Sequence, residues 1–337
     1  MNMHRKPDLD LLYMRMQSML TPMEWSLITP VIEHIQALKA ERQAVILAHN
    51  YMRPEIFHGV ADITGDSLAL AQKAVEVDAE VIVVAGVHFM AETAKLLNPT
   101  RTVLIPDMRA GCSLAESITP DDIRALRQQW PGVPVCVYVN TSAAVKAEAD
   151  ICCTSGNAVR IVEAIARETG SDSVLFLPDR YLAAWVQTQT DVRIIPFDGS
   201  CEVHEQYRPK DIHSIREDYN NDLVVIAHPE CPSDVIQAAD FAGSTAQMAD
   251  YLEREKPGRV LLITECSMGD NLMKSHPQTD FIRSCHMCPH MKRITLPRIL
   301  SALETLSPAI EVPADIAARA KRSLERMLAV GRSAARD

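Results

Sequence analysis

Three cysteines in loops, one repeat length apart, are the residues best suited to hold a metal group. Cys112 is followed 89 residues later by Cys201, and Cys288 stands 87 residues after that. Thiolates select zinc or iron–sulfur clusters, and structural zinc normally takes four protein ligands. Three equivalent sulfurs therefore favour a four-iron cluster, whose open iron could bind substrate as a Lewis acid.

The other cysteines fit different roles. Cys136, Cys152 and Cys153 lie in or beside apolar segments, and we predict that they are small buried packing residues. Cys285 forms a C-x-x-C pair with Cys288, and such a pair could by itself be a redox switch. Because Cys285 has no counterpart at the repeat interval, only Cys288 is assigned to the metal.

Helix starts are predicted at two places from capping boxes. Ser113 and Glu116 have the required spacing directly after Cys112. This would place the thiol at a helix N-terminus, where the amide dipoles favour thiolate over thiol. Thr21 with Glu24 predicts a second start, in a segment whose apolar stripe is typical of a helix.

Hydroxyl groups recur at the same interval as the cysteines. Ser67 returns as Ser155, and again as Ser244, which is followed by Thr245. Ordinary helix capping would explain any one of these serines. Three equivalent helix starts predict instead a pocket of backbone N–H groups and hydroxyls that fits carboxylates or a phosphate.

Three apolar runs end at a polar residue, namely His49, Asn140 and His228. If the runs are parallel strands, these residues lie at the carboxyl ends, where α/β sheets bind ligands. Four further proton-carrying side chains lie within a few residues of the recurring positions: Tyr51, Tyr138, His204 and Glu230. Glu230 and Tyr51 could act as general base and acid, and His204, close after Cys201, should border the metal.

These recurrences predict an α/β fold made of three copies of one unit of about ninety residues. Short apolar runs such as 45–48 and 81–85 are typical of strands buried in a parallel sheet. We expect three three-layer αβα units with short parallel sheets, related by a pseudo-threefold axis in a triangular arrangement around a central site. The predicted domains are 1–103, completed by C-terminal helices in 289–337, then 104–191, and then 192–288.

Composition narrows the class of protein. The chain has 34 basic and 44 acidic residues, hence a net charge of −10, so no broad nucleic-acid surface is expected. The apolar runs are far shorter than the ~20 residues of a membrane helix, and charges interrupt any signal-peptide pattern. We therefore expect a cytoplasmic protein whose nine cysteines serve metal, redox or packing roles rather than a disulfide framework.

Seven short motifs together resemble the quinolinate synthase A family over about residues 40 to 300. They are His49-Asn-Tyr51, Gly65-Asp-Ser67, Phe89-Met-Ala-Glu-Thr-Ala-Lys95, Tyr138-Val-Asn-Thr-Ser142, His228-Pro-Glu230, Gly243-Ser-Thr245 and Cys285-x-x-Cys-Pro289. Each motif alone is weak, but the set is specific. One departure is Ile282, which stands where some members carry the first cysteine of C-x-x-C-x-x-C.

The resemblance implies a triangle of three related α/β domains around a [4Fe-4S] cluster held by three cysteines. It also implies a transferase of NAD biosynthesis that condenses iminosuccinate (iminoaspartate) with dihydroxyacetone phosphate. The expected product is quinolinate, with release of phosphate and two waters. An L-aspartate oxidase or dehydrogenase is the partner expected to supply the unstable imine.

The resemblance also assigns residues by position. The cluster ligands would be Cys112, Cys201 and Cys288, and the catalytic residues Tyr51, Glu230 and His204. The substrate-binding residues would be His49, Ser67, Tyr138, Val139, Asn140, Ser155, His228, Pro229, Glu230, Ser244 and Thr245.

Two other functions are compatible with the same residues. One is a different [4Fe-4S] hydro-lyase of the aconitase type, which would share the open iron. The other is a non-catalytic zinc or iron–sulfur sensor that uses Cys285 and Cys288 as its switch. A repeat scaffold without metal would leave the recurring serines and histidines unexplained.

Overall fold

The computed structural model describes residues 9–17 and 19–333. The chain divides into two compact units. Unit 1 comprises the chain up to Gly111, with Glu265–Pro277 and Met287–Glu311, and unit 2 comprises Cys112–Thr264, Gln278–His286 and the chain from Val312. Residues 1–8, 18 and 334–337, which belong to the predicted first domain and its C-terminal completion, lie outside the described residues.

The strands of the described residues form three parallel four-stranded sheets, each with its strands in the order second, first, third, fourth. Unit 1 holds one sheet, in the order β2 (Ile63–Gly65), β1 (Ala44–His49), β3 (Val81–Ala85) and β4 (Thr102–Leu104). Unit 2 holds the other two sheets. In one the order is β6 (Ile151–Cys153), β5 (Val135–Tyr138), β7 (Ser173–Leu177) and β8 (Arg193–Pro196). In the other it is β10 (Phe241–Ala242), β9 (Val224–Ala227), β11 (Arg259–Ile263) and β12 (Asp280–Ile282). The predicted α/β class with three short parallel sheets is confirmed.

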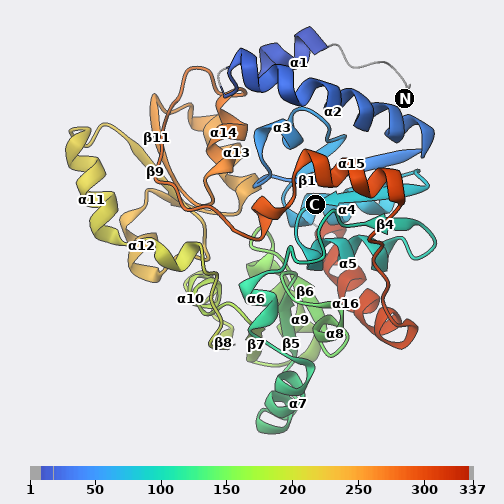
Figure 1. Ribbon diagram of the computed structural model, residues 1–337. Helices are drawn as coiled ribbons and strands as arrows, with labels where there is room; N and C mark the ends of the chain where they lie inside the picture. The colour runs from blue at the N-terminus through green and yellow to red at the C-terminus, as the bar shows by residue number, and fades with distance from the viewer. Residues whose placement is uncertain (1–8, 18, 334–337) are drawn as a thin grey trace. The chain divides into compact units, whose positions relative to one another are not determined.

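Helices connect and cover these sheets (Figure 1). Unit 1 contains α1 (Leu9–Met16), α2 (Pro22–Glu41), α3 (Pro54–Phe57), α4 (Ser67–Glu76), α5 (His88–Leu97), α14 (Ser267–Met273) and α15 (Leu296–Thr305). Unit 2 contains α6 (Ser113–Glu116), α7 (Pro120–Gln129), α8 (Ala143–Lys146), α9 (Ala158–Thr169), α10 (Arg180–Gln187), α11 (Pro209–Asp218), α12 (Ser233–Ala238), α13 (Thr245–Glu255) and α16 (Ala314–Ser333). Two short 3-10 turns follow cysteine loops, at His204–Gln206 and Met291–Arg293.

The two predicted capping boxes had different outcomes. Thr21 caps α2 as predicted, with the Glu24 N–H donating to its hydroxyl and its own N–H donating to the Glu24 carboxylate. The Ser113 box is wrong, because Cys112 itself is the N-cap of α6 and makes no side-chain cap. The Ser113 hydroxyl instead accepts the N–H of Glu202, at 3.1 Å.

One aspartate in each repeat fastens the second strand to the first. The carboxylates of Asp62, Asp150 and Asp240 accept the backbone N–H groups of Ile46, Val135 and Val225 at 2.8, 2.7 and 2.7 Å. The N–H of each aspartate donates to the carbonyl of the same strand residue. We call this paired contact the aspartate clamp.

A cation from the preceding helix completes each clamp. Lys39, Arg127 and Arg216 donate to the three aspartates at 2.7, 2.9 and 2.8 Å. Each cation also donates to a backbone carbonyl two residues before the aspartate. Because the same pattern of four hydrogen bonds occurs in all three repeats, it fixes which residues are structurally equivalent.

The clamps correct the sequence alignment of the strand ends. Three residues beyond the clamped strand residue stand His49, Tyr138 and His228, and two residues later stand Tyr51, Asn140 and Glu230. Grouping Asn140 with the two histidines was wrong, because the apolar run of the second repeat extends past the end of β5 to Val139.

The same register assigns the hydroxyl groups. Ser67, Ser155 and Thr245 each stand four residues after a paired position of the second strand, Ile63, Ile151 and Phe241. Ser244 is the N-cap of α13, in a capping box with Gln247. Thr245, rather than Ser244, is therefore the third member of the recurring set.

The C-terminal helices pack on different sheets. α15 lies beside α2 and β3 in unit 1, whereas α16 packs on α8, α9 and β6 in unit 2 (Figure 1). Strand β8 pairs with β7 and so belongs to the second sheet, although it lies beyond the predicted domain border at residue 191. The borders drawn at residues 103, 191 and 288 remain a prediction. The assignment of the C-terminal helices to the first domain fits α15 but not α16, which packs against the second sheet.

Two further predictions, on buried cysteines and on membrane helices, can be compared directly with the structure. Cys136, Cys152 and Cys153 are wholly buried in the second sheet, as predicted. Among the described residues, no helix is both long and apolar enough to cross a membrane.

Candidate active site

The three predicted cluster cysteines begin the same kind of turn. The carbonyl groups of Cys112, Cys201 and Cys288 each accept an N–H from the residue four positions later, at 3.1, 3.0 and 3.1 Å. All three cysteines are partly exposed and none is in a disulfide. Cys285 and Cys266 are both disulfide-bonded, so the hypothesis of a switch between Cys285 and Cys288 does not describe this structure.

Backbone amides point at two of these sulfurs. The N–H of Met291 donates to Cys288 Sγ at 3.5 Å, and the N–H groups of Val203 and His204 lower the pKa of the Cys201 thiol. Burial and the Glu230 carboxylate outweigh those amides and raise the pKa of Cys201 well above its usual value. Amide donors around a sulfur fit a thiolate that ligates a metal group.

The strand-end residues of unit 2 form one buried network. The Tyr138 hydroxyl donates to Glu230 Oε1 at 2.5 Å, and Glu230 Oε2 lies 2.8 Å from His204 Nδ1. His204 also stacks on His228, with ring centroids 4.7 Å apart. The structure thus brings into contact four residues that the sequence analysis had singled out, namely Tyr138, His204, His228 and Glu230.

This network keeps the central carboxylate charged. Burial alone would raise the pKa of Glu230, but the neighbouring charges of His228 and His204 and the hydrogen bonds from His204 and Tyr138 lower it to about 2. Burial and the Glu230 carboxylate raise the pKa of Tyr138 well above its ordinary value. The pair is therefore a carboxylate that stays ionised beside a phenol that keeps its proton.

Neighbouring residues orient the two imidazoles. His204 Nε2 lies 2.9 Å from Thr264 Oγ1, and the hydroxyl of buried Tyr207 donates to the Thr264 carbonyl. His228 Nε2 lies 3.3 Å from the Ser155 hydroxyl, while its Nδ1 accepts the N–H of Glu230. Each ring is thus held on both nitrogens.

The remaining predicted site residues of unit 2 differ in their roles. Val139 is buried and donates its N–H to the Cys153 carbonyl at 2.8 Å, and Pro229 is buried while Asn140 is partly exposed. Thr245 is buried at the start of α13. The Ser244 hydroxyl accepts the N–H of Gln247 as a helix cap. Its predicted contact with substrate therefore stays a prediction.

Unit 1 repeats the histidine geometry at the end of β1. The N–H of Tyr51 donates to His49 Nδ1 at 3.2 Å, just as the N–H of Glu230 donates to His228 Nδ1 in unit 2. The rings of His49 and Tyr51 meet edge to face. Ser67 opens α4 and is partly exposed, because Asp66 takes the capping role.

Two residues that the sequence did not single out hold the loop after β1. Asn271 donates to the carbonyls of Asn50 and Met52 at 2.9 and 2.8 Å. Lys292 donates to the Tyr51 carbonyl at 2.9 Å and to Glu265 at 2.6 Å.

Buried acids follow the third strand in two of the repeats. Glu265 accepts the N–H of Cys288 and of Ser267 at 3.3 and 2.9 Å. Asp179, at the corresponding position after β7, caps α10 and is wholly buried. These acids could have been found from their shared place at the end of a strand.

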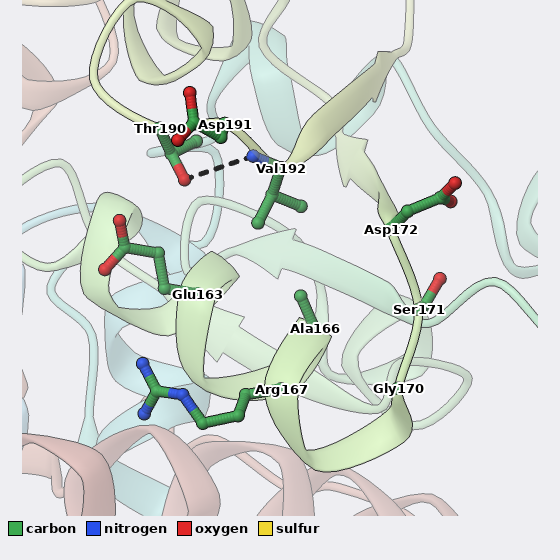
Figure 2. Close-up of a pocket in the computed structure, with 9 residues that line it drawn as sticks. All are labelled: Glu163, Ala166, Arg167, Gly170, Ser171, Asp172, Thr190, Asp191 and Val192. Atoms are coloured by element: carbon green, nitrogen blue, oxygen red, sulfur yellow. Dashed lines mark hydrogen bonds between the residues drawn. The ribbon is translucent and has the colours of Figure 1, made fainter.

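A surface pocket of about 610 Å³ in unit 2 lies away from these residues (Figure 2). It is lined by segments that precede β7 and β8, together with one face of α9: Glu163, Ala166, Arg167, Gly170, Ser171, Asp172, Thr190, Asp191 and Val192. The pocket is therefore at the amino ends of the strands, opposite the edge that carries the network. Parallel sheets bind ligands at the other end.

Comparison with known proteins identifies the family of this chain. The family model described as "Quinolinate synthetase A protein" matches residues 33–329. A protein named quinolinate synthase 2 from Mesorhizobium japonicum is 60% identical over 325 residues, covering 96% of this chain and 99% of that protein. Quinolinate synthases of Xylella fastidiosa and Caulobacter vibrioides are 62% and 55% identical, covering 89% and 91% of this chain and 87% and 84% of their own length. The chain therefore belongs to the quinolinate synthetase A family of enzymes.

Proposed function

We propose that this enzyme makes quinolinate from iminosuccinate and dihydroxyacetone phosphate, releasing phosphate and two waters. The names of its relatives support the product. The observation that carries the proposal is the buried network of Tyr138, His204, His228 and Glu230, which combines a charged base with imidazole and hydroxyl donors. Both substrates are anions, so donors of this kind are needed despite a net charge of −10.

In this proposal Glu230 is the general base. Its carboxylate stays ionised at neutral pH, and a buried carboxylate with a positioned donor can take a proton from a carbon or nitrogen of the substrate. Tyr51 would return a proton as general acid. His204 would stabilise the negative charge that develops on a leaving oxygen.

The hydroxyl and imidazole groups would bind substrate carboxylates and phosphate. Ser67 and Thr245 are the first residues of α4 and α13, where the N–H groups and the dipole favour anions, and Ser155 stands in the turn that precedes α9. His49, Tyr138 and His228 stand at equivalent strand ends and would complete the set with Asn140. Placing reactants this way lowers the entropy cost of joining them.

Cys112, Cys201 and Cys288 would hold a [4Fe-4S] cluster. The residues fit such a group, because none of the three is in a disulfide, all are partly exposed and all begin the same turn. When bound, the cluster would supply one open iron as a Lewis acid for the dehydration steps. An oxidase or dehydrogenase acting on L-aspartate would supply the imine.

The decisive experiment is an anaerobic assay of the purified enzyme with both substrates. Quinolinate formation with a full iron and sulfide content is the expected result. An enzyme with an intact cluster that makes no quinolinate, but dehydrates a hydroxy acid, would overturn the proposal in favour of a hydro-lyase. One zinc per chain that stays bound under anaerobic cluster reconstitution, with no uptake of iron or sulfide, would favour a sensor.

A further inference from the structure

Three side chains of unit 2 alone have the arrangement of a metal-binding site. Cys201 Sγ, His204 Nδ1 and Glu230 Oε2 all lie within 4.8 Å of one another. Nδ1 is the middle atom, 3.2 Å from the sulfur and 2.8 Å from the carboxylate oxygen. We propose that, in the chain without its cluster, these three side chains bind one divalent cation of the zinc type.

The donor set selects the class of cation. One thiolate, one imidazole and one carboxylate are all ligands that zinc accepts, and three protein ligands leave a fourth place for water. Calcium and magnesium prefer sites made of oxygen. A thiolate and a carboxylate also balance the two positive charges, which matters because His204 and Glu230 are only 2% and 3% exposed.

Each of two ligands is already oriented by a partner on its far side. Thr264 Oγ1 lies 2.9 Å from His204 Nε2, so the proton on Nε2 can stay there while Nδ1 ligates. The Tyr138 hydroxyl holds Glu230 Oε1, which leaves Oε2 for the cation. Such outer contacts fix tautomer and ring orientation in metal sites.

The proton balance is simple. The cation takes the place of the thiol proton and of the proton that His204 Nδ1 directs at Glu230, and both protons go to solvent. No electron is transferred. Metal binding should therefore weaken as pH falls, as at other sites whose ligands must lose protons.

The inference goes beyond the proposed function and does not depend on it. Cys201 can serve only one metal group at a time, so a bound zinc would oppose cluster assembly. Cys112 belongs to the proposed cluster ligands but not to this site, whereas His204 and Glu230 belong to this site but are not cluster ligands. Substitutions can thus separate the two assignments.

The test is a titration of cluster-free full-length protein with Co²⁺ under argon, followed by displacement with Zn²⁺. We expect one Co²⁺ per chain, with visible d–d bands and a thiolate-to-cobalt charge-transfer band. Cys112→Ala should bind like the unsubstituted protein. Cys201→Ala should lose the charge-transfer band, and Thr264→Val should bind about 10- to 100-fold more weakly.

His204→Gln and Glu230→Gln give the second measurement. Both should bind Co²⁺ at least about 10-fold more weakly while keeping their circular dichroism. The proposal is overturned if these folded variants bind like the unsubstituted protein, or if Cys112→Ala loses the bands. Cluster reconstitution and quinolinate formation are measured in the same preparations, so failure of the cation site and failure of the proposed function are read separately.

Discussion

The Tyr138 hydroxyl lies 2.5 Å from Glu230 Oε1, joining the end of β5 to the loop after β9. These two residues are 92 positions apart in the chain. Burial favours neutral groups, yet the two histidines keep Glu230 ionised while the phenol keeps its proton. The contact therefore joins the ends of two sheets at one buried, ionised carboxylate.

Glu230→Gln should reduce the turnover number by about 10²–10⁴-fold, because an amide cannot take up the proton. Tyr138→Phe should have a smaller effect, since it removes one hydrogen bond to a carboxylate that stays charged. Quinolinate formation and iron content are measured together. Glu163→Gln, in the pocket at the opposite edge of the sheet, is the control and should remain fully active; a fully active Glu230→Gln would exclude the base assignment.

Cys112→Ala, Cys201→Ala and Cys288→Ala should each abolish assembly of the cluster, because three thiolates are its only proposed protein ligands. Cys285→Ala is the matched control, since this cysteine is disulfide-bonded and lies three residues from Cys288. Anaerobic iron and sulfide content and the visible spectrum provide the measurement. A normal brown cluster in any of the first three variants would remove that residue from the ligand set.

The sequence predicted the central strands well because they are continuous apolar runs. The predicted run 81–85 coincides with β3, and the predicted run 45–48 lies within β1. The second strands β2, β6 and β10 and the last strand β12 were not predicted, because two or three residues are too few to show a pattern. Three of these four strands are instead held by the aspartate clamps, whose members lie far apart in sequence.

The site was predicted by residue type but only partly by equivalence. Tyr138, His204, His228 and Glu230 were all singled out, yet Tyr138 rather than Asn140 is the counterpart of the histidines. The supporting residues Thr264, Asn271 and Lys292 were missed. Each acts through contacts that fold topology creates, and none of them recurs in the sequence.

The three aspartate clamps should each stabilise the folded protein by a similar amount. Asp62→Asn, Asp150→Asn and Asp240→Asn should each lower the free energy of unfolding by about 1.5–3 kcal/mol, the range for hydrogen bonds to charged groups. Asp121→Asn is the control, because its ion pair with Arg124 is on the surface and is worth about 0–1 kcal/mol. Urea denaturation provides the measurement. Equal stability of all four variants would show that the clamp contributes nothing beyond a surface pair.

Lys292 and Glu265 should be strongly coupled. Their side chains are 11% and 1% exposed and 2.6 Å apart, so Lys292→Met leaves a buried charge without its partner, at a cost of about 3–5 kcal/mol. The double variant with Glu265→Gln should recover part of that loss. A double-mutant cycle in urea measures the coupling, and purely additive losses would contradict the ion pair.

Asp107 should make the stability of unit 1 depend on pH. Burial would raise the pKa of this carboxyl, but hydrogen bonds from Arg109 and the charge of Arg298, 2.5 Å away, lower it below its ordinary 3.8. A lowered pKa in the folded state gives a stabilisation that is complete above the unfolded value and is lost as pH falls through the folded one. Asp107→Asn should therefore be less stable near neutral pH and should show a flatter decline below about pH 5. Urea midpoints measured anaerobically from about pH 7 to about pH 4 test this, with exposed Asp191→Asn as the control. A decline as steep in Asp107→Asn as in the unsubstituted protein would show that other carboxyl groups govern the acid sensitivity.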